Sequence, residues 1–348
     1  MNDYTANLTL DQAADLLRDT AGPITVLTHA KPDGDAAGSL VALVTALNAI
    51  GKQATGLLVP PIAPALGFLA HAPHVHHAGD ERDIPADTQR LVIVDTGAYS
   101  QLHPLAEQVE KRLDHTLILD HHLSGDVPAK QRHIDTAAAA AAEIIAGVVG
   151  RLLEGKTVGT PITQTINDAL FTGLASDTGW FRFSNVTPRT HRLAADLIAA
   201  GVNHADLYAR LEQAERPEKL KLLIRAVESL ELLADDRAAV MTLRATDFDQ
   251  TGARAEETER LIDIPQQVGS VQAIALVSEI HTDHGPQTRV SFRSKPIAGA
   301  VNVADLAGQF GGGGHARAAG AKFDRPIGEV RPMIVEALAK AVSAAAAG

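Results

Sequence analysis

The chain has 348 residues and no cysteine, and its 31 lysines and arginines stand against 42 aspartates and glutamates, a formal net charge of -11. The lack of cysteine excludes disulfide scaffolds and cysteine-ligated zinc or iron–sulfur sites. The acidic balance argues against a protein that wraps long duplex DNA, because such binding needs Lys and Arg to replace condensed counterions. With 45% apolar and 21% charged residues, the composition indicates a folded globular protein of roughly two domains.

We expect no secretory signal in the first residues of this sequence. Residues 1–17 have neither a basic start nor an apolar core, so we expect no signal peptide. No apolar run approaches the roughly 18 residues of a membrane span. We therefore expect a cytoplasmic protein that does not act at a membrane.

The first half of the chain alternates short apolar runs with helical patterns, which predicts an α/β fold with a parallel sheet. The apolar runs are short and rich in β-branched residues, as is typical of strands covered on both faces. The predicted strands are 24–29, 53–59, 90–95 and 116–120. The predicted helices are 36–50, a stretch from about 137, 160–175 with Thr160 as its N-cap, and a helix from Pro188 that Gly201 ends.

The second half has a different pattern, with a long connector and a β-hairpin. A charged amphipathic pattern predicts a connecting helix over 214–234. The later elements are strands at 238–245, 271–280 and 288–294, a short helix at 301–310, the glycine segment 311–315 and a final alanine-rich helix. We expect two α/β domains. They are an N-terminal parallel-sheet domain over 1–200 and a smaller C-terminal domain over 237–348, joined by a helical linker over 201–236.

Aspartate and histidine gather in four short motifs, three of which follow predicted strands. THAKPDGD follows the first strand, VDTG and LDHH end two others, and ASDTGWF follows a helix. Open parallel sheets collect ligands at the carboxyl ends of their strands, so these motifs are expected to converge in one crevice. Their acidic and imidazole side chains are His29, Asp33, Asp35, Asp95, Asp120, His121, His122 and Asp177.

Such a crevice favours a pair of divalent cations. Several aspartates cannot share a small site as bare anions, because like charges at close range repel. Two divalent cations would balance the four charges of the carboxylates Asp33, Asp35, Asp95 and Asp177. Carboxylate and imidazole donors without thiolate favour a metal such as Mn²⁺ over a structural zinc, and two such ions suit phosphoryl-oxygen chemistry. Taken singly, each motif also fits a turn or a strand-end cap, and only the joint pattern favours a metal site.

HAKPDGD, VDTG, LDHH and SDTGWF resemble the four motifs of the DHH phosphoesterase family, in the family's order. FRS (292–294) and FGGGGH (310–315) resemble its associated type-1 C-terminal domain. The resemblance covers almost the whole chain and, among subtypes, is greatest for the NrnA-like group. That group implies a two-domain cytoplasmic enzyme with its active site in the interdomain cleft. Its substrates are short oligoribonucleotides (nanoRNA), 3′-phosphoadenosine 5′-phosphate (pAp), or linear and cyclic dinucleotides.

The resemblance also implies two Mn²⁺ ions with six protein ligands. His29 and Asp33 match the ligands of one ion. Asp35 and His121 match the ligands of the other. The ligands shared between the ions, or flanking them, are Asp95 and Asp177.

Two residues of the LDHH motif are implied in catalysis. Asp120 would orient a ligand imidazole. His122 would face the phosphate, as donor to a non-bridging or leaving oxygen. We see no departure from the family pattern at these positions.

Four glycines followed by a histidine, placed between two helices, predict a nest of backbone N–H groups that binds an anion. Elsewhere a glycine run is often a flexible linker. Here it lies inside a domain, and Arg293 is expected on a neighbouring strand. The resemblance implies that the terminal phosphate or nucleotide of the substrate is held by Arg293, Ser294, Gly312, Gly313, Gly314 and His315.

These implications together predict a Mn²⁺-dependent phosphodiesterase that yields 5′-mononucleotides from short RNA or dinucleotides, and AMP and phosphate from pAp. A main role on cyclic dinucleotides (c-di-AMP or c-di-GMP) stays open, because short motifs do not rank these substrates. A RecJ-type exonuclease on long single strands is disfavoured by 3% aromatic residues and the negative charge. A family II pyrophosphatase-like enzyme would carry a different C-terminal motif, and a non-catalytic nucleotide sensor would have lost metal ligands. The resemblance further suggests a homodimer through the first domain.

Two features receive no firm role. The four histidines between 71 and 77 could bind metal, but an exposed loop or strand edge explains them as well. Arg182 and Asn185 follow the SDTGWF motif and fit either a substrate contact or surface packing.

Overall fold

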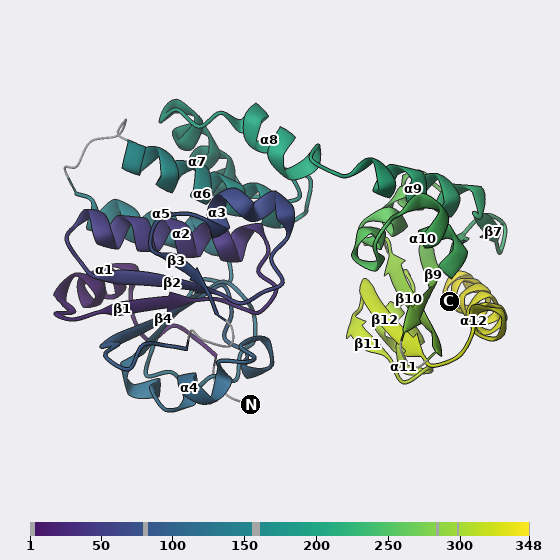
Figure 1. Cartoon of the computed structure of the whole chain (residues 1–348), viewed down its shortest axis with the longest axis horizontal. Coiled ribbons are helices and arrows are strands. Elements are labelled where there is room, and N and C mark those ends of the chain that lie inside the picture. The colour runs from purple at the N-terminus through teal and green to yellow at the C-terminus, as the bar shows by residue number, and fades with distance from the viewer. Residues whose placement is uncertain (1–3, 79–82, 155–160, 283–284, 298, 348) are drawn as a thin grey trace. The chain divides into compact units, whose positions relative to one another are not determined.

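The computed structural model describes residues 4–78, 83–154, 161–282, 285–297 and 299–347. The chain divides between Ala214 and Glu215 into two compact units. Each unit combines a six-stranded sheet with helices (Figure 1), so the predicted two-domain α/β fold is confirmed. Within the described ranges, no helix is both long enough and apolar enough to cross a lipid bilayer.

The first unit is built on a parallel sheet with the strand order β3-β2-β1-β4-β5-β6. The order reverses between β1 and β4, which is the switch point where parallel α/β sheets bind ligands. The four inner strands match the prediction. The edge strands β3 and β6 escape it, because they are polar and only partly buried. The bounds are β1 Ile24–Leu27, β2 Ala54–Leu58, β3 Val75–His77, β4 Arg90–Val94, β5 Thr116–Asp120 and β6 Gln131–Ile134.

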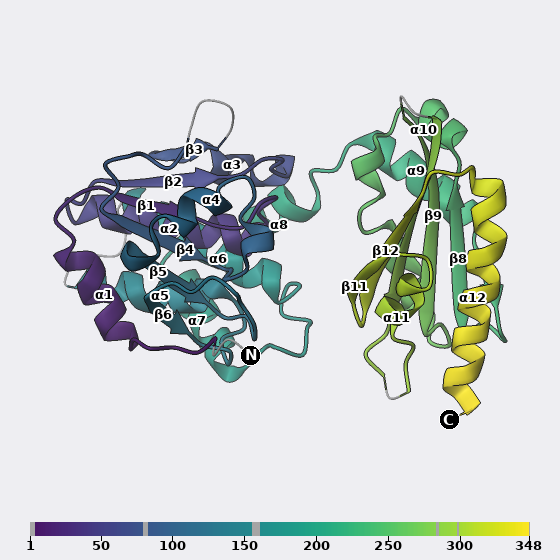
Figure 2. The ribbon, with the colours of Figure 1, turned by 90° about the horizontal axis from the view of Figure 1, so that it is seen from below.

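Both faces of this sheet are covered, which explains the nearly continuous apolar runs of its inner strands (Figures 1 and 2). Val26 and Val92 enter a core with α1, α2, α5 and α6. Leu27 and Ile93 enter a second core on the opposite face, where α4 contributes Val109. The helix bounds are α1 Leu10–Asp19, α2 Gly34–Ala49, α3 Gly67–Ala70, α4 Ala106–Glu110, α5 Ala141–Leu152, α6 Pro161–Asp177, α7 Pro188–Ala199 and α8 His204–Glu212.

Helix α7 begins where the sequence predicts it. Thr187 is its N-cap, its hydroxyl accepts from the Thr190 N–H, and Pro188 occupies the first helical position. The predicted N-cap of α6, Thr160, lies outside the described residues.

The second unit has a mixed sheet in the order β11-β12-β10-β9-β8-β7, in which only the β8–β9 pair is parallel. Strands β9 and β10 form the predicted hairpin, although both extend further toward its turn than the apolar pattern indicates. The strand bounds are β7 Glu231–Leu233, β8 Ala238–Leu243, β9 Ala273–Thr282, β10 Gly285–Ser294, β11 Gly313–His315 and β12 Ala318–Phe323. The helices are α9 Pro217–Glu228, α10 Ala245–Thr251, α11 Val303–Gly308 and α12 Ile327–Ala347.

The charged segment over 214–234 is not one connecting helix. Helix α9 ends at Glu228, and the strand β7 follows it. Leu222 and Ala226, one helical turn apart, are fully buried in a core with residues of β8 and β9. Helix α9 therefore packs as part of the second unit, while α12 contributes to a separate core of that unit.

The sequence predicts that the glycine segment joins two helices, and this prediction is wrong. The segment forms a short strand. Gly313–His315 is β11 and pairs antiparallel with β12. A Cβ at Gly312 or Gly314 would overlap backbone atoms of β12, and Gly314 has a φ of +143°. The glycines thus allow two backbones to approach closely, and glycine's low strand propensity hid this hairpin from a pattern-based prediction.

Candidate active site

The predicted histidines and aspartates converge at the carboxyl ends of β1, β4 and β5. His29 follows β1, and its Nε2 lies 3.9 Å from Asp33 Oδ1 and 3.6 Å from Asp95 Oδ2. Asp95 follows β4, and Asp33 is the N-cap of α2. The loops after β1 and β4 therefore meet at the switch point of the sheet.

A second group surrounds His121, which follows β5. Its Nε2 lies 3.3 Å from Asp95 Oδ1, 3.4 Å from Asp177 Oδ2 and 3.9 Å from Asp35 Oδ2. Asp177 is the last residue of α6, and Asp35 lies in the first turn of α2. Asp95 thus stands between the two groups, with one carboxylate oxygen near each imidazole.

The cluster has the donor set and the unsatisfied atoms that a divalent cation requires. Asp95 Oδ1 and His121 Nε2 are buried, and neither makes a hydrogen bond to another described residue. Buried polar atoms in this state are costly unless another partner, such as a cation, binds them. Three sets of ligand atoms each lie within 4.8 Å of one another. They are His29 with Asp33 and Asp95; Asp35 with His121 and Asp177; and Asp95 with Asp120, His121 and His122.

Backbone carbonyls fix the orientation of both imidazoles. His29 Nδ1 lies 3.0 Å from the carbonyl oxygen of Ala30, and His121 Nδ1 lies 3.2 Å from that of Ala138. A carbonyl oxygen only accepts hydrogen bonds, so each Nδ1 carries a proton and donates it. Each Nε2 is thereby directed toward the carboxylates as the ligand atom.

Local backbone structure holds two of the aspartates. Asp95 has a φ of +61°, in the left-handed region that costs energy for a residue other than glycine and is found at functional sites. Asp35 is fully buried and accepts hydrogen bonds from the N–H groups of Ala141 at 2.6 Å and Ala142 at 2.9 Å. These donors begin α5, so the positive end of that helix offsets part of the cost of burying the carboxylate.

The cluster balances its charges with protons when no cation is bound. Burial lowers the pKa of His29, but Asp95, the Ala30 carbonyl and Asp33 outweigh burial and raise it to about 9. Burial also lowers the pKa of His121. The nearby carboxylates, led by Asp95, outweigh burial and raise this pKa to about 10. The pKa of Asp95 moves the other way: burial would raise it, but the two imidazoles hold it below its usual range.

Two further carboxylates of the cluster, Asp35 and Asp177, are hard to ionise. Burial and then repulsion from Asp95 raise the pKa of Asp177 to about 7. Burial, followed by Asp95 and Asp177, raises the pKa of Asp35 well above its ordinary value. A bound cation would lower both pKa values, because its charge takes the place of the protons that neutralise these carboxylates.

His122 lies at the edge of the cluster, with its side chain 48% exposed. Its Nδ1 lies 2.8 Å from Asp120 Oδ1, and this hydrogen bond raises the pKa of His122. The sequence predicts that Asp120 orients a ligand imidazole, whereas the structure places its carboxylate on the ring of His122 and on the backbone N–H of His121. With Nδ1 engaged, Nε2 is the ring nitrogen through which His122 can meet a phosphate oxygen.

Asp120 has a further partner that the sequence analysis did not find. The carboxylate is fully buried, and its Oδ2 accepts a hydrogen bond of 2.5 Å from the hydroxyl of Tyr4. Burial and the charge of Asp120 raise the pKa of Tyr4 far above its ordinary value, so the hydroxyl stays protonated and donates. No motif surrounds Tyr4, and only the fold brings it to β5.

In the second unit, two of the predicted substrate residues, Arg293 and His315, lie in one row across three strands. Arg293 of β10 and His315 of β11 are both register partners of Ala318 on β12. Residues in one row of a sheet point to the same face, so both side chains flank the small Ala318. Ser294 follows Arg293 and lies near Arg317, whose guanidinium approaches the serine hydroxyl at 3.5 Å. Arg317 is not among the predicted residues, although a basic residue beside the glycine segment is a signal for anion binding.

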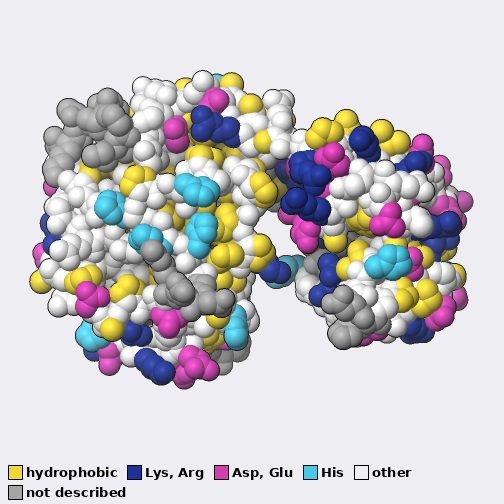
Figure 3. All heavy atoms as spheres, in the orientation of Figure 1, with side chains coloured by type: hydrophobic (Ala, Val, Ile, Leu, Met, Phe, Trp, Pro, Cys, Tyr) yellow, Lys and Arg dark blue, Asp and Glu magenta, His cyan; other side chains and the backbone are white. Residues whose placement is uncertain are grey.

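The remaining candidates of the first unit have structural partners. Asn185 donates to the carbonyl oxygens of Ala139 and Asp177, so it ties the end of α6 to the loop before α5. Arg182 donates from Nε to the carbonyl oxygen of Gly179. Of the four histidines between 71 and 77, His76 and His77 lie on the edge strand β3. Figure 3 shows histidine side chains exposed on the surface of the first unit.

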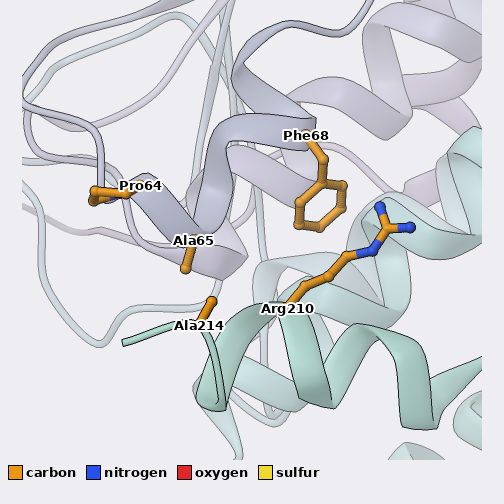
Figure 4. Close-up of a pocket in the computed structure, with 5 residues that line it drawn as sticks. All are labelled: Pro64, Ala65, Phe68, Arg210 and Ala214. Atoms are coloured by element: carbon orange, nitrogen blue, oxygen red, sulfur yellow. The ribbon is translucent and has the colours of Figure 1, made fainter. Parts of the chain in front are cut away.

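A separate hollow of about 390 Å³ lies between α3 and α8 (Figure 4). Its lining is Pro64, Ala65, Phe68, Arg210 and Ala214, none of which belongs to the acidic cluster. The guanidinium of Arg210 lies 5.6 Å from the centre of the Phe68 ring and pairs with Asp206 at 2.9 Å. These contacts account for the charge of Arg210 in this hollow.

Comparison with known proteins agrees with this geometry. Residues 23–174 match the DHH family, N-terminal domain, and residues 235–345 match the DHHA1 domain. Over 309 residues the chain is 30% identical to the bifunctional oligoribonuclease and PAP phosphatase NrnA of Thermus thermophilus, which covers 88% of this chain and 86% of that protein. The chain belongs to the DHH family. The predicted family and its associated C-terminal domain are therefore confirmed.

Two further comparisons place this DHH chain among its relatives. The bifunctional oligoribonuclease and PAP phosphatase NrnA of Bacillus subtilis is 28% identical, over 85% of this chain and 87% of that protein. The crystal structure of an exopolyphosphatase-related protein from Bacteroides fragilis covers 99% of both chains with a TM-score of 0.84. At 18% identity this likeness shows a shared fold. DHH phosphoesterases are hydrolases that use divalent metals, and the acidic cluster is the candidate metal site of this one.

Proton release on metal binding tests the charge balance of this DHH site. Because the pKa of His29 is about 9 and that of His121 about 10, both rings are protonated at neutral pH in the metal-free protein. We expect Mn²⁺ binding at about pH 7.5 to release at least two protons, one from each imidazole, with those held by Asp35 and Asp177 in addition. The apparent affinity should rise as the pH rises toward the pKa values of the imidazoles. Calorimetry in buffers of different ionisation enthalpy measures the number released. Binding without proton release would contradict a site at these imidazoles.

Proposed function

We propose that this chain is a phosphodiesterase that uses two divalent cations, Mn²⁺ in preference, at the acidic cluster. The observation that carries the proposal is the position of Asp95, whose two oxygens face the two imidazoles. One ion would be held by His29, Asp33 and Asp95, and the other by Asp35, His121 and Asp177, with Asp95 shared. The donors are carboxylate and imidazole without thiolate, which favours Mn²⁺.

The residues around the ions divide the remaining work. When bound, a pair of divalent cations makes water more acidic and offsets negative charge on phosphate oxygens. Asp120 holds His122 by Nδ1, so that Nε2 can donate a proton or hydrogen bond to the phosphate or its leaving oxygen. In the second unit, Arg293 and His315 would grip the terminal phosphate or nucleotide of the substrate, aided by Ser294 and the N–H groups of the glycine segment.

The substrates that we propose are short oligoribonucleotides and linear dinucleotides, cleaved to 5′-mononucleotides, and pAp, cleaved to AMP and phosphate. The names of the relatives from Thermus thermophilus and Bacillus subtilis support both activities. The site suits a small anion despite the net charge of -11, because two cations would balance four of its carboxylates. The resemblance to the NrnA-like group also favours a homodimer in the cytoplasm, and a mass measurement in solution tests the dimer.

One substrate panel tests this proposal. With Mn²⁺ present, kcat/KM is compared for pApA, pAp, c-di-AMP, c-di-GMP, long single-stranded DNA and RNAs of about two to ten nucleotides. We expect the highest values for the shortest RNAs and pAp. Activity on cyclic dinucleotides alone would indicate a cyclic-dinucleotide phosphodiesterase instead. Highest activity on long single-stranded DNA would indicate an exonuclease instead. If the enzyme hydrolysed none of these phosphate esters, the proposed phosphodiesterase function would be wrong.

Replacing Arg293 with alanine tests the grip on the substrate. A charge-assisted hydrogen bond contributes roughly 1.5–3 kcal/mol, so we expect KM to rise about ten- to a hundredfold while kcat changes less. The bound metal should be unchanged, because Arg293 belongs to the other compact unit. Arg289→Ala, an exposed arginine on the same strand, is the matched control. Loss of metal in the Arg293 variant would contradict this division of roles.

A further inference from the structure

Tyr4 reaches the catalytic residue candidate His122 through a single carboxylate. Its hydroxyl lies 2.5 Å from Asp120 Oδ2, and Asp120 Oδ1 lies 2.8 Å from His122 Nδ1. The carboxylate is fully buried, whereas the side chain of His122 is 48% exposed. The ring of His122 meets that of His121 edge-on, with 4.6 Å between the ring centres, and Asp120 binds its Nδ1.

The fold provides a slot for the tyrosine ring. A Cβ on Gly97, in the loop after β4, would overlap the hydroxyl end of Tyr4, and a Cβ on Gly125, after β5, would overlap the ring edge. Neither glycine has a positive φ, so space is what both positions require. Phenylalanine would fill the same slot, so Tyr4→Phe removes the hydrogen bond to Asp120 and keeps the ring in place.

The segment that follows Tyr4 is fastened to the sheet. The backbone N–H groups of Asn7 and Leu8 both donate to the carbonyl oxygen of Arg132 on β6. The side chain of Asn7 accepts from the Arg132 N–H and donates to the carbonyl oxygen of Lys130. These bonds run beside the edge strand β6 and set where the tyrosine enters.

We propose that Tyr4 is a positioning residue that fixes the Asp120 carboxylate and, through it, the ring of His122. The inference rests on the proposed function, because it assigns Tyr4 to the phosphate-facing step of that reaction. Without the hydroxyl, Oδ2 of a fully buried carboxylate loses this donor, and the carboxylate can rotate toward other donors. Its hold on His122 Nδ1 then weakens, although the ring of His121 keeps its own partner, the carbonyl oxygen of Ala138.

Tyr4→Phe is the direct test. Loss of an outer hydrogen-bond partner typically costs about 10–100-fold, and we expect kcat for pApA to fall about tenfold. KM and the stoichiometry and affinity of Mn²⁺ binding, measured by calorimetry, should not change. Tyr208→Phe is the matched control, because Tyr208 is an exposed tyrosine on α8 that contacts Trp180. Unchanged kcat in Tyr4→Phe, with an active wild-type enzyme, would overturn the inference.

A double-mutant cycle separates positioning from a general effect on the fold. If Tyr4 acts through His122, Tyr4→Phe should lower kcat in the wild-type background and have no further effect in His122→Ala. An equal loss in both backgrounds, or a loss of metal affinity in Tyr4→Phe, would overturn the inference. An inactive wild-type enzyme would instead overturn the proposed function, so the two failures are distinguishable.

Discussion

Asp95→Asn is expected to abolish phosphodiester hydrolysis, with a loss of at least about a thousandfold. Asp95 stands between the two groups of ligands, so its replacement weakens both sites at once. Metal assistance contributes several kcal/mol to catalysis, and roughly 1.4 kcal/mol corresponds to a factor of ten in rate. Asparagine keeps the size of the side chain and tolerates the φ of +61° better than alanine, so the variant isolates the lost charge.

Two measurements distinguish this effect from misfolding. Calorimetry should show that Mn²⁺ binding is lost or greatly weakened in Asp95→Asn. In the metal-free protein, NMR titration should show that His29 and His121 lose their protons at lower pH than in the wild type, because Asp95 raises the pKa of both. Asp114→Asn is the control, since the Asp114 side chain is 82% exposed and its Oδ1 lies 4.0 Å from Lys130 Nζ. Normal activity in Asp95→Asn would refute the shared-ligand assignment.

The acidic cluster can be predicted from the sequence because short stretches of sequence are enough to indicate it. His29, Asp95 and Asp120 each end or follow a short apolar run, and the carboxyl ends of parallel strands share one edge of a sheet. The strands themselves are recognisable because both faces are buried, which leaves few polar positions inside them. Convergence therefore follows from topology before any side-chain position is known.

Other parts of the site depend on contacts that no local pattern contains. Tyr4 meets Asp120 because Asn7 and Leu8, which follow it, are bound to β6, an edge strand too polar to be predicted. The carbonyl partner of the His121 ring belongs to Ala138, in a segment whose composition indicates only a helix. Glycine is depleted in strands, so the sequence pattern does not reveal the hairpin of β11 and β12, although its register places His315 in the same row as Arg293.

His122→Ala is expected to lower kcat by about a hundred- to ten-thousandfold, the usual range for a group that transfers a proton in the transition state. Both cations should stay bound, because Nδ1 of His122 is engaged by Asp120 and the ligands of the two proposed sites are other residues. KM should change little if His122 acts mainly on charge that develops during the reaction.

The same variant tests an alternative role for His122, that of a metal ligand. His122, Asp120, His121 and Asp95 form a set of ligand atoms close enough to hold a cation themselves. If His122 were a ligand, His122→Ala would lose metal in parallel with activity. His115→Ala provides the matched control, since His115 precedes β5 at the end opposite His122 and is exposed. Retained metal with a reduced kcat would place His122 at the phosphate, and retained metal with full kcat would remove it from the reaction.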